Sequence, residues 1–266
     1  MPEKRSFFRD GINSDLTQGS VFYRAYAEDY GDFINYGLVI TARCDISQEK
    51  APIYSYLPLI SFDNWFLGEF TKILYNKVNK NVYKNLISAF SQIGGSQLLL
   101  ETYGLDVLEK RFSDEGKKAQ RENFFKKVQE YKLLQRLLSD EIEIKEVKSI
   151  INSSKLFLSE SEKIVDDLIS QNLAGYYFID DVTNDGAHVL KLRDVYHIKS
   201  SYALELKNGT RLPNVDYGED QNEVSFTVGE IKSPYIEHIL QKFTNIFSRI
   251  GIDDPDKCMI KELIGN

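Results

Sequence analysis

The chain has 266 residues, 42% hydrophobic and 12% aromatic, so it can bury a substantial core and is not disordered throughout. Its formal net charge of −7 works against extended, nonspecific binding to a nucleic-acid backbone. Charged and amide residues interrupt each apolar stretch before the ~20 residues that a membrane-spanning helix needs, so we expect no membrane contact.

The N-terminus and the cysteines predict a cytoplasmic protein. The opening segment, MPEKRSFFRD, lacks the apolar core of a secretory signal. The two cysteines, Cys44 and Cys258, lie far apart and form no CxxC motif. They suggest no disulfide framework and fit a reducing compartment.

Three β-strands are expected in the first 60 residues. Aromatic and β-branched residues gather in segments 21–26, 37–41 and 53–60. Turn-forming residues such as Gly31-Asp32 separate these segments, as between the strands of a sheet.

From Phe66 onward, apolar residues recur every three or four positions, which indicates amphipathic helices. The pattern predicts a long helix that ends near Gly94-Gly95, a second over 96–112 and a third over 115–138.

A capping-box spacing and a tight turn mark the end of this helical stretch. Ser159 and Glu162 have the capping-box spacing, which predicts a short helix over 163–169. Segments 176–179 and 189–192 then flank Asp185-Gly186, which predicts a hairpin.

The C-terminal part predicts a second turn at Asn208-Gly209, after segment 202–206, and a strand over 223–228. Ser233-Pro234 and Asp254-Pro255 each predict the start of a helix, because proline is favoured at the first helical position.

Strands on both sides of about a hundred helical residues predict an α+β fold, because strands on each side need partners for their edges. We expect one β-barrel domain made of residues 15–65 and 174–266, with a C-terminal helix packed on the barrel. Residues 66–173 would form an all-helical insertion.

One candidate catalytic group lies in segment 41–46, TARCDI. The Cys44 thiolate beside Arg43 would have a lowered pKa and act as a nucleophile if one of the three histidines lay close. The alternative is a buried structural cysteine, with Asp45 capping the following turn.

A second candidate group follows the strand 189–192. Arg193 would stabilise the charge of a phosphorane while Asp194 or His197 moves protons at an RNA 2′-hydroxyl. The alternative is a solvated strand end with an ion pair. If the chain is an enzyme, these residues and Arg43, Cys44 and Asp45 form its site.

The sequence lacks the glycine-rich nucleotide motifs, the HExxH and GxSxG motifs and any clustered Cys/His set, so we expect no cofactor and no metal. Glu230-Ile231-Lys232, with Asp216 or Asp220 upstream, fits the metal-binding carboxylates and lysine of restriction-type nucleases. The same E-x-K spacing occurs six times in the chain, so chance explains it.

Several segments together resemble the SH3-like barrel of the PemK/MazF toxin family: residues 18–22, 37–41, 54–60 with Leu57-Pro58-Leu59, and 190–195. Members of that family are small ribonucleases or gyrase poisons that pair with an antitoxin, so the resemblance implies RNA cleavage or binding of a partner protein. The family's Arg-Pro before the second strand is replaced here by Asn35-Tyr36. The whole pattern also looks like bacterial proteins of defence gene clusters.

We therefore expect a component of a prokaryotic stress or anti-phage defence system, similar to a toxin–antitoxin pair, that acts by associating with another protein of that system. The alternative is a metal-independent endoribonuclease, with RNA as its ligand. A binding module should expose an apolar patch on the insertion, whereas a ribonuclease should gather its polar groups in a basic cleft.

Overall fold

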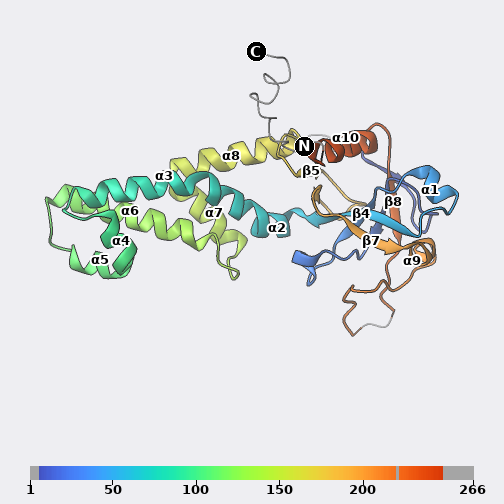
Figure 1. The fold of residues 1–266 in the computed structure, drawn as a ribbon, viewed down its shortest axis with the longest axis horizontal. Coiled ribbons are helices and arrows are strands. Elements are labelled where there is room, and N and C mark those ends of the chain that lie inside the picture. Colours follow the sequence, from blue (N-terminus) through green and yellow to red (C-terminus); the bar gives the residue numbers. More distant parts are fainter. Residues whose placement is uncertain (1–5, 220–221, 248–266) are drawn as a thin grey trace, which may run out of the picture. The chain divides into compact units, whose positions relative to one another are not determined.

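The computed structural model describes residues 6–219 and 222–247 and has an α+β fold (Figure 1). The chain divides into two compact units. Among the described residues, the sheet unit comprises 6–59, 174–176, 190–219 and 222–247, and the helical unit comprises 60–173 and 177–189. The predicted domain limits, 15–65 with 174–266 and 66–173, stay a prediction.

The strands form a curled sheet in the order β1-β8-β2-β3-β4-β6-β5, with β7 also paired to β4. The pairs β1–β8, β2–β8, β2–β3, β3–β4 and β4–β7 are antiparallel. The strands are β1 (Phe8–Asp10), β2 (Ser20–Tyr23), β3 (Tyr36–Val39), β4 (Ile53–Ser61), β5 (Tyr176–Ile179), β6 (His188–Lys191), β7 (Tyr196–Lys199) and β8 (Thr227–Ile231).

The sheet unit has its own apolar core. Phe22 of β2, Val39 of β3 and Tyr54 of β4 are fully buried and belong to one cluster. Gly37 makes this packing feasible, because a Cβ atom there would lie 2.4 Å from the Phe22 ring. The absent side chain lets an aromatic ring lie across the neighbouring strand.

Short helices accompany the strands of the sheet unit. They are a 3-10 turn (Glu28–Tyr30), α1 (Arg43–Ser47), α9 (Ser200–Glu205) and α10 (Tyr235–Phe247). The Tyr235 ring of α10 lies 4.3 Å from the ring of Phe7, between centroids. The predicted helix at Asp254-Pro255 lies outside the described residues.

The helical unit contains two long helices, α3 and α6, which pack on each other, and α8, which packs on α3 and α7. Buried residues recur along α3 at positions 74, 78, 82 and 86, one face of a helix. The helices are α2 (Phe62–Trp65), a π-helical turn (Phe66–Phe70), α3 (Thr71–Ser91), α4 (Gln97–Tyr103), α5 (Leu105–Arg111), α6 (Lys118–Arg136), α7 (Ile144–Ser153) and α8 (Lys155–Ile169).

Two predicted helix boundaries in this unit were wrong. The helix expected over 96–112 is broken at Gly104, whose φ of 71° allows the chain to turn between α4 and α5. The helix expected to begin after Ser159 begins at Lys155. Ser159 lies inside it and donates a hydrogen bond back to the Leu156 carbonyl, so it caps nothing.

One strand boundary in the sheet unit also differs from the prediction, and a helix lies where none was predicted. The strand expected over 223–228 begins at Thr227, and only Ser225 forms an isolated bridge, to Thr210. Segment 202–206 falls largely in α9, because its buried residues Ala203 and Leu206 lie three positions apart, a helical spacing. Within the described residues, no helix has both the length and the apolar character needed to cross a membrane.

Candidate functional site

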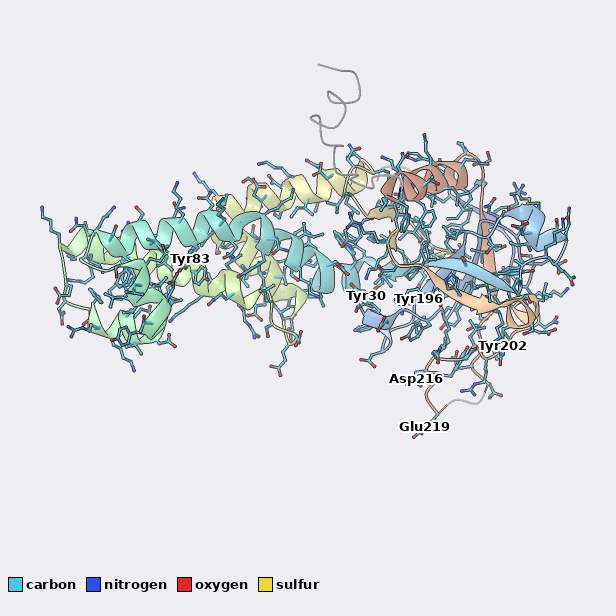
Figure 2. All side chains as sticks on the ribbon, in the orientation of Figure 1. Tyr30, Tyr83, Tyr196, Tyr202, Asp216 and Glu219 are labelled. Atoms are coloured by element: carbon cyan, nitrogen blue, oxygen red, sulfur yellow. The ribbon has the colours of Figure 1, made fainter. Side chains whose placement is uncertain are left out.

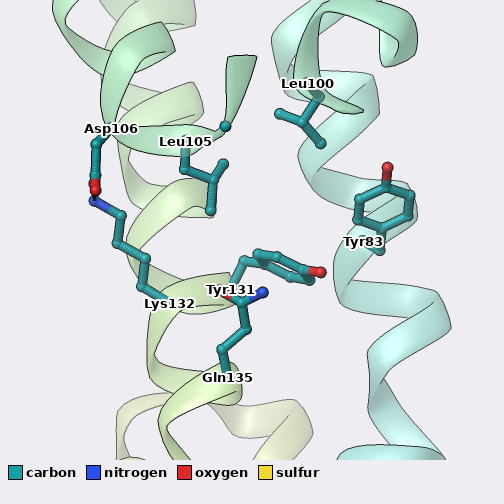
Figure 3. A pocket seen from close by; sticks show the side chains of 8 residues that line it. Tyr83, Leu100, Leu105, Asp106, Tyr131, Lys132 and Gln135 are labelled. Carbon is teal, nitrogen blue, oxygen red and sulfur yellow. Dashed lines mark hydrogen bonds and ion pairs between the residues drawn. The ribbon is translucent and has the colours of Figure 1, made fainter. Parts of the chain in front are cut away.

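A pocket of about 540 Å³ lies among α3, α4, α5 and α6 of the helical unit (Figure 3). This volume is in the usual range for pockets that bind small ligands. The lining residues are Tyr83, Leu100, Gly104, Leu105, Asp106, Tyr131, Lys132 and Gln135.

The hairpin of α4 and α5 forms one wall of this pocket. Leu100 and Leu108 anchor the two helices in the apolar cluster that also contains Phe90 and Phe124. The stacked rings of Phe90 and Phe124 lie 5.0 Å apart and fix α3 against α6. The pocket therefore has a packed base, and its aromatic side chains are held in place.

Tyr83 of α3 and Tyr131 of α6 supply the aromatic surfaces of the pocket, with ring centroids 5.6 Å apart and ring planes at 44°. Burial raises the pKa of Tyr83, and the Glu101 carboxylate, which accepts its hydroxyl hydrogen bond, raises it further. Burial also raises the pKa of Tyr131, whereas a hydrogen bond with Gln135 lowers it. Both phenols therefore stay neutral at physiological pH.

Lys132 carries a positive charge at the edge of the pocket and ties α6 to α5. Its ammonium group donates to Asp106 over 2.6 Å and also to Glu109. The hydrogen bond from Lys132 lowers the pKa of Asp106, and the same contacts raise the pKa of Lys132. The ion pairs hold both groups in their charged forms.

The same hairpin exposes three large apolar side chains within ten residues. Leu98 is 72% exposed, Tyr103 56% and Val107 53%. We call these three residues the α4–α5 surface. Single exposed apolar residues are ordinary, but several on one short hairpin beside a pocket are typical of an interaction site.

The first predicted catalytic group lies at α1 of the sheet unit. Arg43 forms a 3.6 Å ion pair with Glu230, and the Cys44 sulfur lies 3.6 Å from the Asp45 carboxylate. Cys44 is exposed, so the interpretation as a buried structural cysteine was wrong. The thiol is accessible to solvent and has an acidic neighbour.

The second predicted group follows β6. Arg193 is exposed beside Gly175, Asp194 forms a 2.7 Å ion pair with Lys191, and the His197 ring bonds to Ser55 over 3.0 Å. In the described chain, the two groups form these hydrogen bonds and ion pairs with different residues and not with each other. Their union in one catalytic site stays a prediction.

Sequence reasoning missed a buried charge cluster in the sheet unit around Lys191, whose side chain is only 8% exposed. Its ammonium group contacts Asp194 and Asp29, and it lies 5.1 Å from the centre of the Tyr30 ring. Tyr196, labelled near Tyr30 in Figure 2, accepts a hydrogen bond from the Glu28 backbone. The only sequence signal was a lysine between two leucines in a strand.

The described residues proposed for a restriction-type metal site have other partners, and Asp220 lies outside the described residues. Glu230 pairs with Arg9 and Arg43, and Lys232 donates to Ser6. Among the described residues, no three acidic, histidine or cysteine side chains are grouped so that they could hold a metal ion.

Comparison with known proteins gives no match to a family model, a curated protein or a solved structure.

Proposed function

We propose that the protein is a component of a prokaryotic stress or defence system and acts by binding another protein through the α4–α5 surface. The observation that carries the proposal is the exposure of Leu98, Tyr103 and Val107 on one hairpin next to a pocket. The wider assignment to a defence system rests on the resemblance to toxin–antitoxin proteins.

The physical chemistry of the hairpin supports this role. Burying an apolar side chain contributes roughly 1.5–3 kcal/mol, so a partner that covers three of them gains substantially. Aromatic residues next to a pocket are frequent binding hot spots. The hairpin itself is fixed by Leu100 and Leu108, so little conformational entropy is lost on binding.

Leu98→Glu combined with Val107→Glu tests this proposal. Tagged full-length protein would be isolated from the cells that encode it, and its bound proteins would be quantified by mass spectrometry. We expect one stoichiometric partner to be lost from the double variant and kept by Ile12→Glu, a matched control whose target residue is 71% exposed in the sheet unit. Equal loss in both variants would contradict the proposal.

The alternative function is a metal-independent endoribonuclease, and the exposed positions of Cys44, Arg193 and His197 favour it. It predicts that purified protein cleaves a mixed RNA pool in the presence of a chelator. Cleavage that is lost in Arg193→Ala or Cys44→Ala would support this alternative. Absence of cleavage by the wild type would exclude it under those conditions and leave protein binding as the proposed function.

A further inference from the structure

We infer that the pocket among α3, α4, α5 and α6 receives an arginine side chain of the partner protein, against the tyrosine rings of its wall and next to an excess of carboxylates. The inference rests on the proposed function, because it names the group that the partner contributes at the same surface.

The aromatic walls favour a planar cation. Tyr83 and Tyr131 come from different helices, and their rings are tilted by 44° at 5.6 Å. Figure 3 shows Tyr131 extending into the space below Leu105, with Tyr83 on the opposite wall. A guanidinium group stacks on such rings and is attracted to their electron-rich faces.

The charges around the pocket also favour a cation. Among the described residues that line the pocket, Lys132 is the one positively charged side chain. It already contacts Asp106 and Glu109. Glu101 adds a third carboxylate through its hydrogen bond with the Tyr83 hydroxyl. Lys110 also lowers the pKa of Asp106, by less than Lys132 does. Two carboxylates therefore pair with one ammonium group, and a third lies beside Tyr83, so the acidic groups outnumber Lys132 and a second cation would be stabilised there.

Arginine fits this environment better than lysine does. Its five N–H groups lie in one plane, so they can donate to carboxylates at the pocket edge while the face of the group rests on a tyrosine ring. The volume of about 540 Å³ also leaves room for the side-chain stem and for neighbouring residues of the partner.

The test uses N-acetyl-arginine-methylamide as a probe for the full-length, isotope-labelled protein, with the citrulline analogue as a neutral control of the same shape. NMR titration should show shifts at residues of α3–α6 around the pocket, and about fivefold weaker or no binding of citrulline. Equal affinities for the two probes, or no shifts at saturating arginine probe, would overturn the inference.

Variants locate the site. Tyr131→Leu and Glu101→Gln should each weaken arginine binding, with Tyr131→Leu costing about fivefold. Glu122→Gln on α6 is the control, because Glu122 is 66% exposed and pairs with Lys118. Thermal melting of Tyr131→Leu separates lost binding from lost folding, and Glu101→Gln changes an exposed residue only. Unchanged arginine affinity in both variants would overturn the inference.

The same variants separate this inference from the proposed function. Partner binding that survives Tyr131→Leu and Glu101→Gln but is lost in the Leu98→Glu, Val107→Glu double variant would refute the arginine pocket alone. If arginine still binds to the pocket but the partner protein binds the Leu98→Glu, Val107→Glu double variant as tightly as the wild type, the proposed function alone is refuted.

Discussion

Both units have an apolar core, but the sheet unit also contains a buried network of polar contacts. In the sheet unit, a loop is held by buried polar contacts: the Ser225 hydroxyl donates to the Arg24 carbonyl and also bonds to Tyr217. The Arg24 side chain, only 15% exposed, pairs with Glu223. In the helical unit, stacked phenylalanines form the core, and the ion pairs of Lys132 and Arg136 lie nearer the surface.

This difference indicates which surfaces of the protein are free to bind a partner. Buried hydrogen bonds fix the loop of the sheet unit in one conformation, since an unpaired buried polar group is costly. The helical unit is stabilised by an apolar core that does not contain the exposed residues Leu98, Tyr103 and Val107. A surface that folding does not require can be used for a partner.

The largest expected effect is that of Phe124→Ala in the helical unit. Removing this fully buried ring should lower the free energy of unfolding by about 3–5 kcal/mol, because it leaves a cavity beside Phe90. Chemical denaturation measures the loss, and amide exchange should localise it to the helices. The neighbouring Phe125→Ala, at a half-buried position, should cost clearly less. Equal costs would contradict an apolar core centred on Phe124.

An intermediate effect is expected for Ser225→Ala in the sheet unit. The substitution deprives the Arg24 carbonyl and the Tyr217 hydroxyl of a partner, which should cost about 1–3 kcal/mol. Denaturation curves would be compared with those of Ser201→Ala, an exposed position that should change stability little. A neutral Ser225→Ala would show that this polar network does not stabilise the loop.

The smallest expected effect is a pH dependence from His188. Burial lowers its pKa, although the Gly186 carbonyl and nearby carboxylates act in the opposite direction. The unfolded chain therefore binds a proton near pH 6.5 while the folded chain does not, so stability is full above that pH and falls below it. His188→Gln should reduce this slope in melting experiments between pH 7 and 5. If the slope of stability against pH is unchanged in His188→Gln, the pH dependence comes from other titratable groups.

The sequence predicted the central strands and the long helices well, because their burial follows simple periods. Segment 53–60 is apolar and buried almost throughout in β4, and α3 buries every fourth residue over most of its length. The helix α9 was not predicted, because its segment is too short to show a helical period. The interruption at Gly104 was missed because one glycine inside an apolar period is ambiguous.

The candidate site could not be predicted in the same way. Tyr83 and Tyr131 belong to different helices and meet only through the packing of α3 on α6. Lys132 stood among many other lysines in the sequence, and its pairing with Asp106 depends on the fold of the hairpin. The residues that were predicted, such as Cys44 and His197, were chosen for their chemistry alone.

Site-specific photo-crosslinking tests the central claim most directly. A photoreactive amino acid would replace Val107 in the full-length protein, and Ile12 in a control protein, inside the cells that encode the chain. We predict a single heterologous protein adduct from position 107, none from position 12, and adduct peptides that contain arginine. The account would be contradicted if position 107 formed adducts only with a second copy of this chain. It would also be contradicted if positions 107 and 12 formed the same adducts.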